Sequence, residues 1–210
     1  MVYSLLRNTP DCHIILFDNS DRLPFGELDG VEVIDNTAGQ VLDFNEFLSR
    51  YPRKMYTTNN WGSAKHCYTV DYLVRTISGG FVLADSDILF KKDISDLFDD
   101  RFLFVGEVRE RQKDRCNRVP RLLPFLCWIN TDLCQKNGIR YFDGNRSWKL
   151  KLTPPDKWYD TGASFLEDSL KSGLLVRYVN INDYMIHFYG GSYKNKDWKA
   201  WLEENKELYE

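Results

Sequence analysis

The sequence has few of the features that mark secreted, membrane-spanning or nucleic-acid-binding proteins. Its 5 cysteines are odd in number and scattered, without a Cys-x-x-Cys pair, so we expect neither a disulfide framework nor a zinc site. No apolar run reaches the ~20 residues that span a bilayer, and the first residues lack the apolar core of a signal peptide. A net charge of -3 argues against nucleic-acid binding through bulk charge. We therefore expect a cytoplasmic protein with no transmembrane segment and no nucleic-acid partner, and leave peripheral membrane association open.

The composition predicts one folded domain over residues 1–210. A hydrophobic content of 43% with 15% aromatic residues excludes disorder, and no internal repeat divides the chain. Strands and helices alternate through the first half, which predicts an α/β sheet with helices on both faces. The expected strands lie within residues 13–17, 31–35, 56–58, 81–90, 101–107, 125–130 and 174–179. The expected helices cover residues 1–8, 43–50, 63–77, 131–136, 163–170 and the tail from 198.

An acidic pair within residues 81–90 stands out from this pattern. An apolar strand runs into Asp85 and Asp87, and apolar residues follow at once. In a strand, residues i and i+2 point to the same side, so the two carboxylates can converge on one cation. Placing two charges at the end of a buried strand is unfavourable unless they pair or bind a metal. The competing interpretation is a solvated acidic turn.

The chemistry of these side chains favours Mn²⁺ or Mg²⁺ as the cofactor. Such hard cations take one or two protein carboxylates together with substrate phosphates. His187 could add an imidazole nitrogen, which suits Mn²⁺, and Lys194 beyond the paired glycines that follow could reach a phosphate. The competing interpretation of His187 is a histidine of the core or of a turn.

Four motifs, in order along the chain, resemble those of GT-A glycosyltransferases of the family-2 type. The first is Asp18-Asn19-Ser20 after a strand, and the second is Asn60-Trp61-Gly62-Ser63-Ala64 before a helix. The third is Asp85-Ser86-Asp87, the DxD motif of these enzymes, and the fourth is His187 with Gly190, Gly191 and Lys194. Together they span residues 13–194. The resemblance implies a GT-A-like (Rossmann-like) fold with a mixed central sheet.

The resemblance also implies an activity, the transfer of a sugar from a nucleotide-diphosphate donor, expected to be a UDP-sugar, to a glycan or other hydroxyl acceptor. A Mn²⁺ or Mg²⁺ ion held by Asp85, Asp87 and His187 would assist the leaving diphosphate. The positions implied to contact the donor are Asp18, Asn60, Gly62, Lys65, Asp85 and Lys194.

If the enzyme inverts, a carboxylate must accept the proton of the acceptor hydroxyl. Asp160 is the first candidate for this base, and its competing interpretation is helix N-capping. Glu167 and Asp168 resemble the Glu-Asp pair that supplies the base in many inverting relatives. Their competing interpretation is an exposed helix face.

In one respect the chain departs from the family. These enzymes usually begin with a strand that contacts the nucleotide base, whereas residues 1–8 read as the helix that follows it. We therefore expect an N-terminally shortened domain with reduced stability or loss of donor binding. Two other functions remain open: a haloacid-dehalogenase-like phosphotransferase, whose nucleophile also lies in a DxD, and a catalytically impaired sugar-binding relative.

Overall fold

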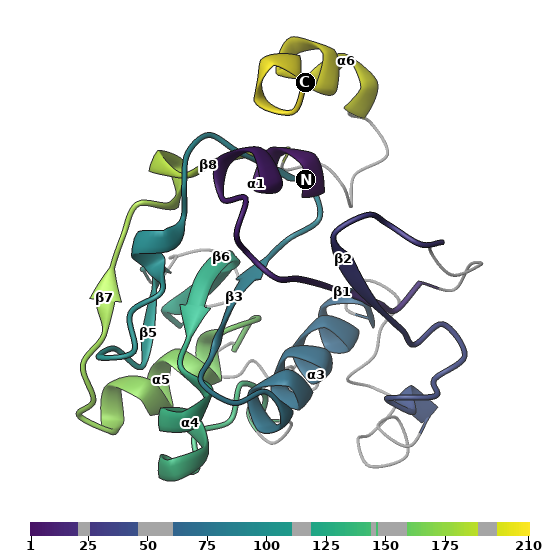
Figure 1. Ribbon diagram of the computed structural model, residues 1–210. Coiled ribbons are helices and arrows are strands. Elements are labelled where there is room, and N and C mark those ends of the chain that lie inside the picture. The colour runs from purple at the N-terminus through teal and green to yellow at the C-terminus, as the bar shows by residue number, and fades with distance from the viewer. Residues whose placement is uncertain (21–25, 46–60, 111–118, 144–145, 147–158, 189–196) are drawn as a thin grey trace.

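Strand β6 (Arg121–Ile129) is the centre of a four-stranded sheet, seen in the computed structural model of Figure 1. The structure describes residues 1–20, 26–45, 61–110, 119–143, 146, 159–188 and 197–210. The order of strands is β3 (Phe81–Ala84), β6, β5 (Phe104–Arg109) and β7 (Arg177–Tyr178). Strand β6 is antiparallel to β3 and β5, while β5 and β7 are parallel. The predicted α/β class is therefore confirmed, with a sheet of mixed orientation.

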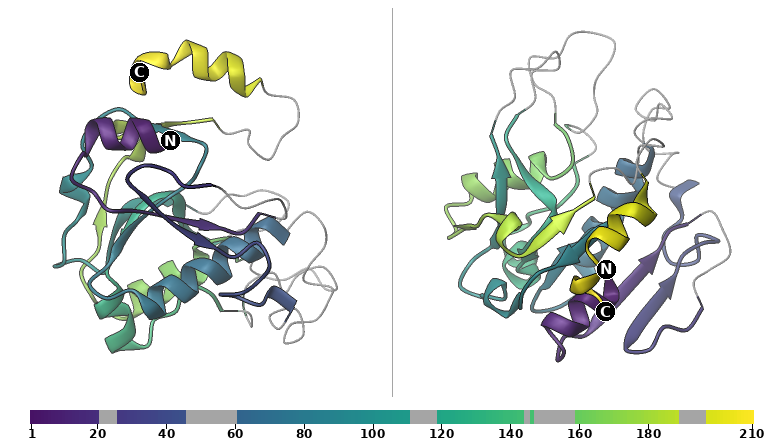
Figure 2. Two further views of the ribbon diagram at one scale, coloured as in Figure 1. Left: turned by 45° about the vertical axis from the view of Figure 1, so that its right-hand side comes forward. Right: turned by 90° about the horizontal axis from the view of Figure 1, so that it is seen from above.

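Both faces of this sheet are covered by other elements. Neighbouring residues of a strand point to opposite faces, so they join different core clusters. Phe104 and Leu122 belong to a core cluster shared with the helices α3 (Trp61–Thr76), α4 (Thr131–Asn137) and α5 (Ala163–Lys171). Val105 and Leu123 belong to a second cluster, on the other face, shared with helix α1 (Val2–Asn8) and with the 3₁₀ turns η2 (Ser95–Leu97) and η3 (Ile181–Asp183). Figure 2 shows α3, α4 and α5 on one side of the sheet and α1 on the other.

Strand β1 (Ile14–Asp18) and strand β2 (Val31–Asp35) form a separate, parallel pair. Among the described strands, neither is hydrogen-bonded to the four-stranded sheet. A third pair is antiparallel and joins β4 (Ile88–Phe90) to β8 (Met185–His187). The helix α6 (Trp198–Glu204) and the turn η4 (Lys206–Leu208) complete the chain, and the Trp201 ring lies 5.3 Å from that of Phe188.

The structure corrects the prediction of a single strand within residues 81–90. Strands β3 and β4 belong to different sheets, and residues 85–87 form the turn between them. Most of the other predicted elements are present, with shifted ends, although strand 174–179 shrinks to β7. The expected strand at 56–58 and most of the helix at 43–50 lie outside the described residues. Within the described part of the chain, no helix has the length and apolar character needed to cross a bilayer.

A buried carboxylate attaches α3 to the segment that follows α4. The side chain of Asp71 is fully buried, and its Oδ1 accepts hydrogen bonds from the backbone N–H groups of Tyr141 at 3.0 Å and Phe142 at 3.3 Å. The guanidinium of Arg140 lies against both of its oxygens, with Nε 2.9 Å from Oδ1 and 3.1 Å from Oδ2. Arg75, one turn along α3, lies 3.4 Å from Oδ2.

Gly162 allows α5 to begin directly against the central strand. It is the N-cap residue of α5 and adopts a left-handed conformation with φ of 79°. A Cβ atom at this position would lie 2.2 Å from the carbonyl oxygen of Leu122. Only glycine therefore permits this approach of helix to strand.

Candidate functional site

Asp85 and Asp87 lie in the turn where the chain leaves the four-stranded sheet and joins the β4–β8 pair. The turn is held at both ends: Asp85 N–H donates to the carbonyl oxygen of Phe125 at 3.1 Å, and Phe188 N–H donates to that of Asp87 at 2.9 Å. The two carboxylates are thus brought together by a turn anchored to two sheets, and not by the alternation of side chains along one strand.

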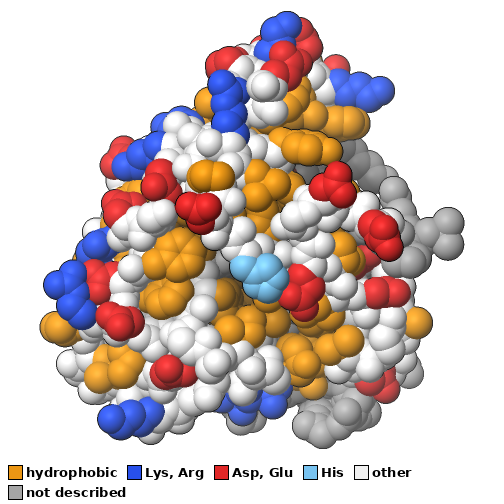
Figure 3. Space-filling view, in the orientation of Figure 1, with side chains coloured by type: hydrophobic (Ala, Val, Ile, Leu, Met, Phe, Trp, Pro, Cys, Tyr) orange, Lys and Arg blue, Asp and Glu red, His pale blue; other side chains and the backbone are white. Residues whose placement is uncertain are grey.

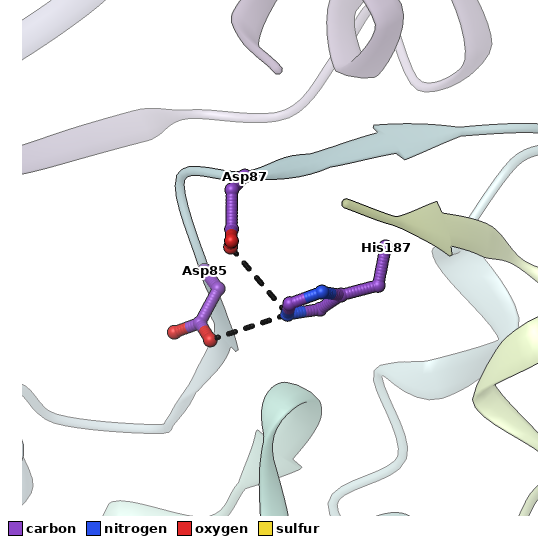
Figure 4. Close-up of side chains that lie close together, drawn as sticks. All are labelled: Asp85, Asp87 and His187. Atoms are coloured by element: carbon purple, nitrogen blue, oxygen red, sulfur yellow. Dashed lines mark ion pairs between the residues drawn. The ribbon is translucent and has the colours of Figure 1, made fainter. Parts of the chain in front are cut away.

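His187 approaches this turn from the far end of the chain. In the β4–β8 ladder it is the partner of Ile88, the residue directly after Asp87. Its Nε2 atom lies 3.4 Å from Asp87 Oδ1 and 3.7 Å from Asp85 Oδ2, as the dashed lines of Figure 4 show. The ligand atoms of all three side chains lie within 4.8 Å of one another. The structure thus places the three predicted metal ligands in one cluster.

The imidazole of His187 is more buried than its two partners. Its side chain is 6% exposed, against 25% for Asp85 and 29% for Asp87. The ring packs against Phe125, with 4.4 Å between ring centroids, which restricts its orientation. A fixed imidazole beside two partly exposed carboxylates leaves one side of the cluster open to a ligand. On the face shown in Figure 3, a histidine lies beside an acidic side chain at the surface.

The spacing of the cluster is close to that of a small divalent ion site. In an octahedral site with bonds of 2.0–2.1 Å, neighbouring ligands lie about 3 Å apart and opposite ligands about 4.2 Å apart. The distances from His187 Nε2 to the two carboxylates, 3.4 Å and 3.7 Å, lie between these two values, so the three side chains could contact one small ion. The competing arrangement is a direct contact of the imidazole with both carboxylates, which needs no ion.

A cavity of about 740 Å³ extends from this cluster between β1 and β3. Asp85 and Ser86, which follow β3, and Asn19, which follows β1, line it together with His66. The carboxyl ends of the two strands thus contribute its polar groups, as expected for a ligand site of an α/β sheet.

His66 is a site residue that the sequence analysis missed. Its Nε2 atom is buried and has no hydrogen-bond partner among the described residues, although the ring lines the cavity. Burial lowers the pKa of His66, an effect partly opposed by the nearby carboxylate of Asp85. A neutral imidazole is therefore expected there, ready to hydrogen-bond a ligand. The signal in the sequence was its helical spacing with Val70, Leu73 and Ile77, which also line the cavity.

Three other positions implied to contact a donor, Asp18, Gly62 and Lys65, are described by the structure and lie around the start of α3. Asp18 is 3% exposed, and its Oδ1 accepts a hydrogen bond from Ser20 N–H at 2.9 Å. The Asn19 side-chain amide donates a hydrogen bond to the Thr69 hydroxyl of α3 at 2.7 Å, and Lys65 Nζ lies 3.4 Å from the Asn19 carbonyl oxygen. Gly62 lies exposed in the first turn of α3. Asn60 and Lys194 lie outside the described residues.

The predicted general bases lie in two other groups of charged side chains. Asp160 pairs with Arg121 at 2.9 Å. The N-cap residue of α5 is Gly162 and not Asp160, whose Oδ1 accepts a hydrogen bond from Thr161 N–H at 2.8 Å. On α5, Glu167 and Asp168 both contact Arg146. Glu167 also accepts from the Tyr159 hydroxyl at 2.8 Å and pairs with Lys171 at 3.0 Å, so these carboxylates form an ion-pair network on the helix.

Comparisons of the chain with protein-family models, with curated proteins and with solved structures found no match. The function must therefore be argued from the side chains themselves.

Proposed function

We propose that this chain is a metal-dependent glycosyltransferase with a GT-A-like fold. It would move a sugar from a nucleotide-diphosphate donor, expected to be a UDP-sugar, to a hydroxyl of a glycan or other acceptor. The observation that carries the proposal is the convergence of Asp85, Asp87 and His187 at the carboxyl end of β3. The mixed α/β sheet is consistent with the fold class but does not distinguish GT-A from other members of it.

The donor set fits Mn²⁺ or Mg²⁺, since it provides two carboxylates and one imidazole and leaves further positions for phosphate oxygens. When bound, such an ion supplies positive charge to the diphosphate leaving group. Asp85 and Asp87 would hold it from the turn, while Phe125 keeps the His187 ring in place. The proposed contacts of the donor are Asp18, Gly62, Lys65, Asn60 and Lys194.

Acceptor activation is assigned to one of the three carboxylates named above. Asp160 could accept a proton once the acceptor displaces Arg121, which now lies 2.9 Å from its Oδ2. Glu167 or Asp168 would have to separate from Arg146 in the same way.

Titration calorimetry with Mn²⁺ tests the metal site directly. We expect one site per chain, and we expect Asp87→Asn to weaken Mn²⁺ binding by at least about tenfold, because it removes an anionic ligand of nearly unchanged shape. Asp29→Asn, at an exposed position in another turn, is the matched control and should bind Mn²⁺ like the wild type. Equal Mn²⁺ affinity in Asp87→Asn and wild type would refute the metal assignment.

Hydrolysis of nucleotide-sugars then separates the candidate functions. Mn²⁺-dependent release of sugar from a UDP-sugar, lost in Asp87→Asn, would support the glycosyltransferase. Metal and nucleotide binding without turnover would indicate a catalytically impaired relative. Hydrolysis of an aryl phosphate that requires Asp85 would instead favour a phosphotransferase of the haloacid-dehalogenase type.

A further inference from the structure

The cavity beside the metal cluster runs along the edges of two strands. All of β3 and residues 14–17 of β1 line it. Since successive side chains of a strand point to opposite faces, a cavity that touches every residue in turn follows the edge of the strand rather than one face. Among the described strands, β1 pairs only with β2 and β3 only with β6, so each has one edge without a partner strand. Both of these edges border the same cavity.

The volume of the cavity is of the same order as that of one additional strand. A five-residue strand is about 16.5 Å long, lies about 4.8 Å from each neighbour and occupies a layer about 10 Å thick, which gives a volume on the order of 800 Å³. The cavity measures about 740 Å³. Strand β1, on one of its walls, has 5 residues.

The two remaining walls are mostly apolar, although His66 and Thr69 of α3 also line the cavity. Val70 and Leu73 of α3 line one side, and Leu5 of α1 and Ile94 line the other. Val70 belongs to the core cluster on one face of the four-stranded sheet, while Leu5 and Ile94 belong to the cluster on the opposite face. A strand in the cavity would therefore be covered on both faces, a situation that favours continuous apolar sequence. At present all four residues of β3 are partly exposed, and Ile15 of β1 is 39% exposed.

Two carboxylates line the cavity, together with the imidazoles of His13 and His66 and with Met1 at the amino terminus. Asp11, which precedes β1, and Asp85, which follows β3, both line it, whereas no Lys or Arg of the described residues does. Basic residues flanking an apolar segment would complement these carboxylates. An acyl chain with an anionic headgroup would be repelled by them and would leave the backbone groups of both edges without partners.

We propose that this cavity binds an extended peptide of a partner protein, about five apolar residues long and flanked by basic residues. The peptide would add a strand between β1 and β3 and join the two sheets into one. Backbone hydrogen bonds to both edges would supply recognition of the extended conformation, and the apolar walls would select Val, Ile and Leu side chains. The proposal does not depend on the metal cluster or on transferase activity.

The test uses a fluorescein-labelled synthetic peptide with alternating Val and Ile between terminal lysines, measured by fluorescence anisotropy with the full chain. We expect saturable binding with one peptide per chain, and unchanged binding in EDTA. The matched control peptide carries N-methyl groups on alternate residues, which remove backbone donors while keeping every side chain. It should bind at least about tenfold more weakly. No binding of the first peptide, or equal binding of both peptides, would overturn the proposal.

Two variants of the chain locate the peptide. Ile15→Lys places a charge on the β1 edge at a position already 39% exposed, so the fold should tolerate it, and the affinity for the peptide should fall at least about tenfold. Val41→Lys, at a position 37% exposed that does not line the cavity, should bind the peptide like the wild type. Hydrogen exchange should show new protection of β1 and β3 amides when the peptide is bound. Protection elsewhere, or a self-associated chain that the peptide fails to dissociate, would contradict the assigned occupant.

Discussion

Replacement of Asp71 by asparagine tests how strongly a buried charge holds α3 to the segment after α4. The substitution keeps the size and shape of the side chain but removes its charge. One of its two polar atoms becomes a donor that faces other donors, either the Arg140 guanidinium or the backbone N–H groups of Tyr141 and Phe142. The buried groups that lose their acceptor cannot all turn to water.

The expected loss of stability follows from these contacts. Breaking a buried ion pair by removing one partner costs about 3–5 kcal/mol. The Arg140 side chain is 50% exposed and can regain water, which places the cost near the lower limit, at about 3 kcal/mol. For a chain of this length about 2–4 °C is lost per kcal/mol, so the melting temperature should fall by about 6–12 °C.

Thermal unfolding followed by circular dichroism, with urea titration at 25 °C, measures this loss. The urea midpoint should fall while the m-value stays constant, as expected when stability changes without a change in the surface exposed on unfolding. Glu203→Gln is the control, because it removes an ion pair to Lys206 whose members are both largely exposed, and it should unfold like the wild type. A fall of less than about 2 °C for Asp71→Asn would refute the reasoning.

Two further predictions concern the backbone of the helices and the effect of alkaline pH. Gly162→Ala should destabilise the protein far more than Gly138→Ala in thermal unfolding, although both glycines adopt the left-handed conformation. Gly138 has open space around it, so its replacement costs about 1–2 kcal/mol from the backbone conformation alone. A Cβ at Gly162 would in addition lie 2.2 Å from the carbonyl oxygen of Leu122. Similar losses in the two variants would show that α5 can move away from the strand. Burial and the hydrogen bond to Asp96 raise the pKa of Tyr184 to about 12, so between pH 10 and 12 the native state keeps a proton that the unfolded chain has lost, and stability should decrease as the pH rises. Urea midpoints at pH 9.5 and 11.5 should show a smaller decrease for Tyr184→Phe, and an identical decrease would contradict this origin.

The helices and strands predicted from sequence alone are confirmed where the sequence pattern that indicates them is local. Helix α3 and the strands β1 and β2 follow from periodicity and from the turn residues that bound them, because each sequence carries its own signal. The continuous strand at 81–90 failed for a non-local reason. Strand β3 pairs with β6, whereas β4 pairs with β8. The residue types between 81 and 90 do not indicate that the two halves of this segment pair with different strands.

The candidate site shows the same division. The residue types Asp, Asp and His suggested one cation site, and the β4–β8 ladder is what brings His187 to the acidic turn. His66 escaped notice because its spacing reads as part of the apolar face of α3. The arginine partner of Asp160 depends on long-range packing, which the sequence around a carboxylate does not encode.

The position of the acidic turn between two sheets has a consequence for the stability of the fold. An ion shared by Asp87 and His187 would close a loop of about 100 residues. A covalent cross-link over such a loop would stabilise the folded state by about 4–5 kcal/mol, because it lowers the entropy of the unfolded chain. A reversible ion gives part of this effect, set by its concentration relative to its dissociation constant. A bound ion would then stabilise the β4–β8 pair reversibly. Chelation of the ion would destabilise this pair more than the central sheet.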